Sequence, residues 1–281
     1  MMPFGQDKFV EVDGLQLHYV EWGQPDSPTI LLLHGFQSNA HTWDTFSSSM
    51  ADRYHVVALD QRGHGDSAWA PLGDYTTDAF IRDIVGFIEA LKLVPVSVVG
   101  HSMGGRHATM LAADYPDLVR KLVIVDTPAE LPPERVALRK QQLASDDLPL
   151  PEIFATFEAV IMNGMAQYPL TPEAELRHAN YHNLIRGDDG QWGWRWDPEL
   201  LLRRRHNRAQ QPDLYLYLRR VRCPALLIRG QHSPLLTADI AAKMVAALPK
   251  ARMVAIADAA HTVNADNAAA FNEATRAFIQ E

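Results

Sequence analysis

The sequence predicts an α/β protein with a mostly parallel, eight-stranded sheet, helices on both faces of the sheet and an inserted helical cap. Short apolar runs without alternation, typical of strands buried on both faces, take turns with longer segments whose apolar residues recur at helical spacing. This rhythm stops after residue 128 and resumes after residue 212. We therefore expect an α/β core at residues 1–128 and 213–281, and a mostly helical cap at residues 129–212.

Length and composition agree with one large domain that carries an insertion. The chain has 281 residues, of which 47% are hydrophobic and 21% are charged, enough for a sizeable core. A formal net charge of −8 argues against a general binder of nucleic acids or anionic membranes. Cys223 is the single cysteine, which excludes an intramolecular disulfide framework. No stretch approaches the ~18 apolar residues of a membrane span, and the N-terminus has no basic region followed by an apolar run, so we expect a cytoplasmic protein.

The first elements are a hairpin and two buried strands. Residues 9–12 and 15–22 alternate apolar and polar side chains around Asp13-Gly14, a pair typical of tight turns, so they predict two antiparallel strands at a sheet edge. The runs at 29–33 and 55–59 show no alternation and predict buried strands. Between them, Trp43 and Phe46 at helical spacing predict a helix that ends near Met50. Glycines and turn formers at 60–67 predict a compact loop.

The remaining core elements continue this alternation. Phe80, Ile84 and Phe87 recur at helical spacing and predict a helix over 75–93. Apolar runs predict strands at 95–99, 122–125, 224–228 and 253–256, and apolar periodicity predicts helices at 103–113, 238–248 and 267–279. Strands and helices that alternate in this way predict a parallel sheet covered on both faces.

One stretch carries a sequence motif with a known chemical use. Gly100-His101-Ser102-Met103-Gly104 matches the pattern G-x-S-x-G, and it lies between a predicted strand and a predicted helix. In such a turn the backbone is strained, small flanking residues allow it to fold tightly, and the serine hydroxyl is presented at the end of the sheet. Ser102 is therefore the candidate nucleophile.

Four motifs in order connect the chain to a known family. They are His34-Gly35-Phe36 after the third strand, residues 60–67 after the fourth, the Ser102 turn, and Asp258-Ala-Ala-His261 after the last strand. With these motifs the chain resembles the serine-nucleophile, cap-bearing enzymes of the α/β-hydrolase fold, such as carboxylesterases and lipases, over nearly its whole length. The resemblance implies that the backbone N–H groups of Phe36 and Met103 form an oxyanion hole.

A serine nucleophile needs a base and an acid. His261 is the expected base, because it follows the last strand and completes the order serine, acid, histidine. Most members of the resembling family carry the acid after the strand that is 225–228 here, but residues 229–236 contain no carboxylate. Asp126, after the preceding strand, is therefore the expected acid. Asp258 and Asp266 are alternatives by their nearness to His261, and a Ser-His dyad remains if Asp126 only caps the entrance to the cap.

Other residues have less specific interpretations. Trp192, Trp194 and Trp196 alternate, so in an extended segment they share a face, either anchoring the cap or lining an apolar substrate pocket. His34 and His101 flank the site in sequence and are expected to support its loops or to line the same pocket. In the loop at 60–66 we expect Arg62 and Asp66 to pair rather than bind a metal with His64. The arginines at 203–205 are expected on a solvated helix face or beside acids.

These residues predict a serine hydrolase of small carboxylic esters that works through an acyl-enzyme without a metal or organic cofactor. Its expected partner is a small-molecule ester. A lactone, a thioester or a C–C bond is an alternative target, because fold and triad do not separate these reactions. A cofactor-free dioxygenase and a ligand receptor with slow turnover are more distant alternatives. Haloalkane dehalogenases and epoxide hydrolases are disfavoured, because the resemblance to them would require an aspartate in place of Ser102.

Overall fold

The computed structural model describes residues 5–144, 152–207 and 212–281, and eight strands form its central sheet. These strands are β1 (Gln6–Val12), β2 (Leu15–Trp22), β3 (Thr29–Leu33), β4 (His55–Leu59), β5 (Val96–His101), β6 (Val119–Val125), β9 (Ala225–Gly230) and β10 (Ala251–Ile256). Their order across the sheet is β1-β2-β4-β3-β5-β6-β9-β10. Pairing is antiparallel from β1 to β4 and parallel from β4 to β10. The predicted eight-stranded, mostly parallel sheet is confirmed, as is the hairpin at its edge.

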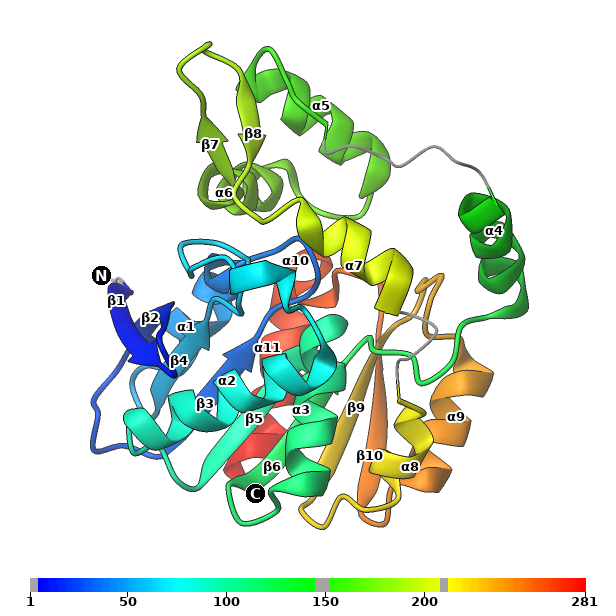
Figure 1. Cartoon of the computed structure of the whole chain (residues 1–281). Helices are drawn as coiled ribbons and strands as arrows, with labels where there is room; N and C mark the ends of the chain where they lie inside the picture. The colour runs from blue at the N-terminus through cyan, green and yellow to red at the C-terminus, as the bar shows by residue number, and fades with distance from the viewer. Residues whose placement is uncertain (1–4, 145–151, 208–211) are drawn as a thin grey trace.

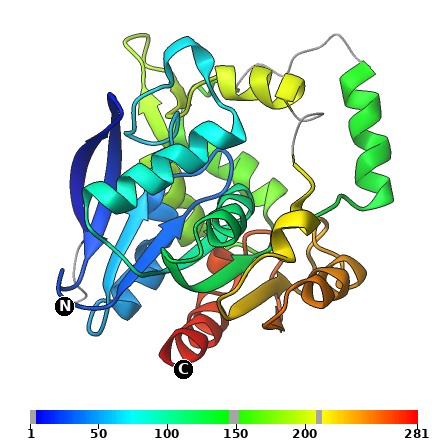
Figure 2. The same ribbon diagram turned by 60° about the horizontal axis from the view of Figure 1, so that its bottom comes forward.

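Successive residues of the central strands face two separate hydrophobic cores. In β3, Leu31 and Leu33 contribute to one core, whereas Ile30 and Leu32 contribute to the other. The first core is covered by α2 (Thr77–Ala90), α3 (Met103–Asp114), α8 (Leu214–Leu218) and α9 (Ala238–Ala247). The second is covered by the short helix η1 (Ala40–Trp43), α1 (Asp44–Met50), α10 (Val263–Asp266) and α11 (Ala268–Gln280). In Figure 2, α11 (red) lies on the opposite side of the sheet from α2 and α3.

The described residues between β6 and α8 form helices and one small hairpin. The helices are α4 (Pro133–Ala144), α5 (Phe157–Gln167), α6 (Glu173–Asn183) and α7 (Glu199–Asn207), and the strands are β7 (Leu184–Arg186) and β8 (Trp192–Trp194). In Figure 1, α5 to α7 and the hairpin lie as a layer above one end of the sheet. The hairpin lies outside the predicted strands, because each of its strands has three residues. In β7 only Leu184 is buried, and in β8 the alternation of Trp192 and Trp194 is too short to predict a strand.

The loop after β4 is braced by a different ion pair from the expected one. Arg62 binds Asp83 of α2 with two hydrogen bonds, Nε to Oδ2 at 2.5 Å and Nη2 to Oδ1 at 2.6 Å. Asp66 pairs instead with Arg195, in the layer above the sheet. The predicted Arg62–Asp66 pair is therefore wrong, because α2 packs beside this loop and offers Arg62 a buried carboxylate. The 3-10 turn η2 (Pro71–Gly73) precedes α2.

The cellular location, the boundaries of the cap and the surroundings of the arginines at 203–205 are tested only in part or not at all. No helix in the described parts of the chain combines the length and the apolar character needed to cross a membrane, and the cytoplasmic location stays a prediction. The boundaries of the cap at residues 129 and 212 also stay predictions. Arg203 pairs with Glu199 one turn earlier on α7, while the side chains of Arg204 and Arg205 lie outside those described.

Candidate active site

Ser102 lies on a strained turn between β5 and α3. Its backbone has φ 52° and ψ −110°, in the left-handed half of the Ramachandran plot that costs a non-glycine residue energy. Two glycines make the turn possible. A Cβ at Gly100 would come within 2.3 Å of the carbonyl oxygen of Gly104, and one at Gly104 within 2.2 Å of the carbonyl oxygen of Leu33. The turn leaves Ser102 half-buried at the end of the sheet.

A histidine bridges this serine and a buried carboxylate. His261 Nε2 lies 3.0 Å from Ser102 Oγ, and His261 Nδ1 lies 2.8 Å from Asp126 Oδ2. Asp126 follows β6 with no exposed surface, whereas 23% of the His261 side chain is exposed. With the proton of the neutral ring on Nδ1, the ring donates a hydrogen bond to the carboxylate, and the Nε2 lone pair is directed at the serine hydroxyl. The arrangement can draw a proton from Ser102.

Asp126 is held by the loop after β9, which sequence reasoning had set aside because it lacks a carboxylate. The backbone N–H of Gly230 donates to Asp126 Oδ1 at 3.0 Å, and the hydroxyl of Ser233 donates to Asp126 Oδ2 at 2.6 Å. Ser233 is itself buried. The carboxylate therefore accepts three hydrogen bonds, which compensate for its removal from water. Only the adjacency of β6 and β9 in the sheet reveals the contribution of Ser233, since 107 residues separate it from Asp126.

The two alternative acids lie on either side of His261 in the chain, Asp258 in the turn after β10 and Asp266 at the end of α10. Asp258 is exposed and has a positive φ of 51°. Asp266 accepts hydrogen bonds from the backbone N–H of Ala260 at 2.7 Å and from the hydroxyl of Thr262 at 2.8 Å. Because Ala260 and Thr262 are the neighbours of His261, Asp266 fixes the backbone on both sides of the histidine.

His101, at the end of β5, holds the loop of His261 by a hydrogen bond to its backbone. Its Nε2 donates to the carbonyl oxygen of His261 at 2.8 Å, and the two rings lie 4.8 Å apart. Burial lowers the pKa of His101 to about 3, so the ring is neutral at pH 7. A neutral ring adds no positive charge beside His261. A Cβ at Gly35 would approach His101 Nδ1 to 2.8 Å, so the close approach of this loop to His101 requires glycine.

His34 fixes the peptide bond that precedes Phe36. Its Nε2 accepts the backbone N–H of Gln61 at 3.0 Å, and its Nδ1 donates to the carbonyl oxygen of Gly35 at 2.7 Å. Burial lowers the pKa of His34, which keeps this pattern of one donor and one acceptor. The peptide unit is planar, so holding the Gly35 carbonyl also fixes the direction of the Phe36 N–H. The backbone N–H of Gly104 donates to the carbonyl oxygen of His34 at 3.1 Å, which joins this loop to the start of α3.

The three tryptophans occupy different environments. Trp196 is buried in a small cluster with Tyr75 and Phe80, against which Phe36, Met103 and Trp194 pack. Its ring centroid lies 6.4 Å from that of Phe36 and 6.3 Å from that of Trp194. Trp192 instead contacts Phe157 of α5, with ring centroids 5.5 Å apart. Trp194 and Trp196 thus lie beside the two residues expected to supply the oxyanion hole, while Trp192 packs within the layer above.

Fold and site together define a hydrolase with a serine at a strand-to-helix turn, and comparison with known proteins agrees. A family model for the alpha/beta hydrolase fold matches residues 28–268, and the chain belongs to this family. The 2-(acetamidomethylene)succinate hydrolase of Mesorhizobium japonicum is 29% identical over 91% of this chain and 88% of its own length. A crystal structure of E-2-(acetamidomethylene)succinate hydrolase has a TM-score of 0.88, with 29% identity, and covers 99% of this chain and 100% of that one.

A shorter match points the same way. An esterase of Mycobacterium tuberculosis is 35% identical over 63% of this chain and 59% of its own length, less than two thirds of the relative. A crystal structure of the M. tuberculosis esterase has a TM-score of 0.82 at 28% identity, covering 99% of this chain and 93% of that one. These relatives are esterases and hydrolases, and this chain is an enzyme of the same hydrolase family.

Proposed function

We propose that this chain is a serine hydrolase that cleaves small carboxylic esters through an acyl-enzyme. The observation that carries the proposal is the position of the His261 ring, with Nε2 3.0 Å from Ser102 Oγ and Nδ1 2.8 Å from the buried carboxylate of Asp126. Both distances are within the reach of proton transfer and orientation by hydrogen bonds. The family relationship supports the same assignment.

In the proposed reaction, Ser102 Oγ attacks the ester carbonyl carbon while its proton passes to His261 Nε2. Asp126 keeps the other ring proton on Nδ1 and stabilises the imidazolium that forms. The negative charge on the tetrahedral oxygen is met by the backbone N–H groups of Phe36 and Met103. The alcohol leaves with the proton from His261. His261 then accepts a proton from a water molecule that attacks the acyl carbon, and returns it to Ser102 Oγ as the carboxylic acid leaves.

Hydrolysis of p-nitrophenyl esters of increasing acyl length tests the proposal. Ser102→Ala should lower kcat by about 10⁴-fold or more, because the base has no use without the nucleophile and removing one member costs about as much as removing the whole unit. Ser49→Ala, whose hydroxyl binds the carbonyl oxygen of Phe46 on α1, is a matched control that should keep wild-type turnover. A fluorophosphonate should add one adduct per wild-type chain and none to Ser102→Ala. Unchanged hydrolysis by Ser102→Ala would refute the nucleophile.

Other acyl bonds belong in the same screen, because a full-length relative is named for hydrolysis of 2-(acetamidomethylene)succinate. We expect kcat/KM to be higher for simple esters than for this enamide, for lactones, for thioesters or for C–C bonds next to a carbonyl. A higher value for any of these would replace the ester as the preferred substrate. Oxygen uptake with a heteroaromatic substrate would indicate the dioxygenase alternative, and ligand binding without turnover would indicate a receptor.

A further inference from the structure

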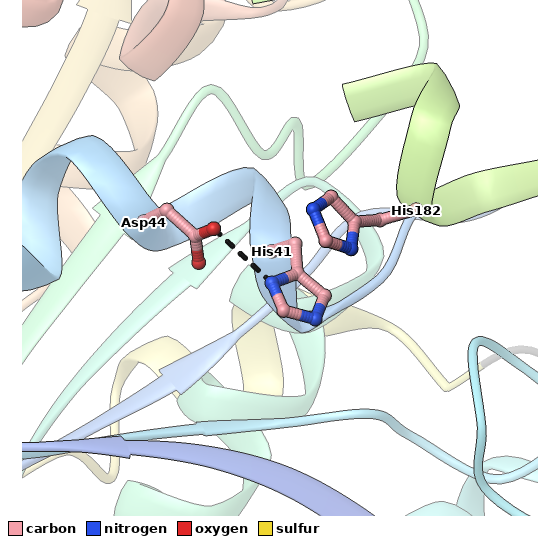
Figure 3. A group of neighbouring side chains, drawn as sticks. All are labelled: His41, Asp44 and His182. Carbon is pink, nitrogen blue, oxygen red and sulfur yellow. Dashed lines mark hydrogen bonds and ion pairs between the residues drawn. The ribbon is translucent and has the colours of Figure 1, made fainter. Parts of the chain in front are cut away.

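Imidazole and carboxylate groups gather where helix α6 meets the first helical segment of the core. This histidine cluster consists of His41 in η1, Asp44 at the start of α1, and His178 and His182 in α6. Among the residues that the structure describes, His41, Asp44 and His182 form the one group of three potential metal ligands with their donor atoms within 4.8 Å of one another. Figure 3 shows the three side chains converging from the two elements.

The spacing within each element places its two ligands on one face. His178 and His182 are four residues apart in α6, and a histidine pair at this spacing is the arrangement by which a helix binds a metal. His41 and Asp44 are three residues apart, with Nδ1 and Oδ2 at 3.1 Å. The continuous segment of η1 and α1 therefore offers two ligands and α6 the other two, and the cluster joins segments more than 130 residues apart in the chain.

The distances within the cluster are close to those of a zinc site. His178 Nε2 lies 2.9 Å from Asp44 Oδ2. The rings of His41 and His182 stack with centroids 3.7 Å apart, so one ring has to turn out of the stack before the in-plane lone pairs of both can point at one ion. Ligand atoms in a tetrahedral site with bonds of about 2.0 to 2.1 Å are about 3.3 Å apart. The donor atoms of His41, Asp44 and His182 lie within 4.8 Å of one another, so rotation of their side chains is enough to bring them to this geometry. The cluster is also reachable, since His178 is exposed and the other three are half-buried.

Asp7 adds the feature that orients a histidine ligand. Its Oδ1 lies 3.4 Å from His41 Nε2, on the ring nitrogen opposite to the one that faces Asp44. Metal-binding histidines usually donate their second N–H to a carboxylate, which fixes the tautomer and the direction of the ring. Asp7 lies near enough for this role, and its Oδ1 is shared with His18 Nε2 at 3.2 Å. His41 thus has a ligand partner on one nitrogen and a supporting carboxylate on the other.

We propose that His41, Asp44, His178 and His182 bind one divalent transition metal ion such as Zn²⁺, and that the ion ties α6 to η1 and α1. Imidazole nitrogens with one carboxylate suit zinc and its neighbours rather than calcium or magnesium. The bound ion would also be connected to the proposed active site through α6. Asn183 follows His182 and donates to the carbonyl oxygen of Gln37 at 2.7 Å, and Gln37 follows Phe36.

Calorimetric titration of metal-free protein, without an affinity tag, with ZnCl₂ tests the site. We expect one Zn²⁺ per chain and a rise in the melting temperature. His41→Ala and His182→Ala should each weaken binding by at least about tenfold, and Asp7→Asn by less, because it removes only the supporting carboxylate. His232→Ala is a matched control, since it removes an exposed histidine outside the cluster and should leave the affinity unchanged.

A second pair of variants tests the carboxylate. Asp44→Asn should weaken Zn²⁺ binding, whereas Asp52→Asn, which changes an exposed carboxylate just after α1, should not. Circular dichroism establishes that each variant is folded, and Co²⁺ should give the intense visible bands of a tetrahedral ion in the wild type but not in His182→Ala. Zn²⁺ affinity that is the same in the wild type, His41→Ala and His182→Ala would overturn the proposal, as would the absence of binding to the wild type.

Discussion

The two sides of the proposed active site are held by different kinds of contact. On the side of the sheet, Asp126 is fully buried and accepts three hydrogen bonds, and His101 and His34 hold their loops from inside the core. On the other side, ion pairs between the layer of α5 to α7 and the core are partly exposed, as Arg195 with Asp66 and His178 with Asp44 show. A hydrogen bond from the neutral Tyr75 hydroxyl to Asp197 is a buried contact on this side.

This difference predicts that the two sides control different properties of the enzyme, the rate of the chemical step and the affinity for substrate. A buried, charge-assisted hydrogen bond is costly to leave unmade, so it enforces one geometry. An exposed ion pair contributes at most about 1 kcal/mol and can be exchanged for water. We therefore expect changes on the sheet side to lower the rate of the chemical step, and changes in the layer above to alter mainly the affinity for substrate.

Among changes to the residues that support Ser102, the largest effect should follow from Asp126→Asn. The Asn carbonyl can still accept the N–H of Gly230, but its amide group would then face His261 Nδ1 as a donor. His261 must become an acceptor at Nδ1, which puts its proton on Nε2 and removes the base from Ser102. We expect kcat to fall about 10³ to 10⁴-fold with little change in KM. The rate of ester hydrolysis, measured over a range of substrate concentrations up to saturation, gives both kcat and KM.

Asp258→Asn is the matched control for this variant, because it changes an exposed carboxylate three residues before His261 and should retain kcat. Equal losses in the two variants, or a larger loss for Asp258→Asn, would contradict the assignment of Asp126.

Two ion pairs of the loop after β4 differ in burial, so breaking each one shows how burial affects the free energy of unfolding. Arg62 and Asp83 are 9% and 6% exposed, whereas Arg195 and Asp66 are 33% and 44% exposed. Burial raises the pKa of Asp83 despite its ion pair, which reflects the cost of desolvation. Asp83→Asn leaves the buried guanidinium with only the more exposed carboxylate of Asp74, at 4.0 Å, and should lower the free energy of unfolding by about 3 kcal/mol. Asp66→Asn should lower it by less than about 1 kcal/mol.

Urea unfolding of both variants and the wild type measures the difference. Similar midpoints for Asp83→Asn and Asp66→Asn would mean that burial does not distinguish the two pairs.

Ser233→Ala should have an intermediate effect on the reaction. It removes the 2.6 Å hydrogen bond to Asp126 Oδ2 but leaves those from Gly230 and His261, so the carboxylate stays buried with weaker support. We expect kcat to fall roughly tenfold, in line with the loss of one charge-assisted hydrogen bond. Ser233→Thr retains the hydroxyl and should restore most of kcat. If Ser233→Thr is as slow as Ser233→Ala, Ser233 does not act through its hydrogen bond.

The sequence predicts those parts of the molecule that depend on local pattern and chain order. Six strands follow from apolar runs and the two of the edge hairpin from alternation around a tight turn, and the strained turn at Ser102 follows from the glycines around it. The order of the strands along the chain also places Asp126 and His261 at the same edge of the sheet as Ser102. The catalytic roles of these three residues stay predictions.

Contacts between segments distant in sequence could not be predicted in the same way. Ser233 acquires its role because β9 lies beside β6, and His101 because the His261 loop folds over it from 160 residues away. Arg62 illustrates the error that results, since proximity in sequence favoured Asp66 while packing supplied Asp83. The hairpin of β7 and β8 shows a second limit, because three-residue strands carry too little periodicity to be recognised.

The smallest effect should come from Asn183→Ala, which tests the side of the site above the sheet. Asn183 donates to the carbonyl oxygen of Gln37 at 2.7 Å and so links α6 to the loop of Phe36. That loop keeps its own hydrogen bonds from His34 and Gln61, so the Phe36 N–H should hold its direction without Asn183. We expect KM for a p-nitrophenyl ester to rise roughly threefold, which corresponds to less than about 1 kcal/mol, while kcat changes by less than about twofold. A fall in kcat as large as that of Ser233→Ala would show that the layer above the sheet also fixes the geometry of the reaction, and the division between the two sides would fail.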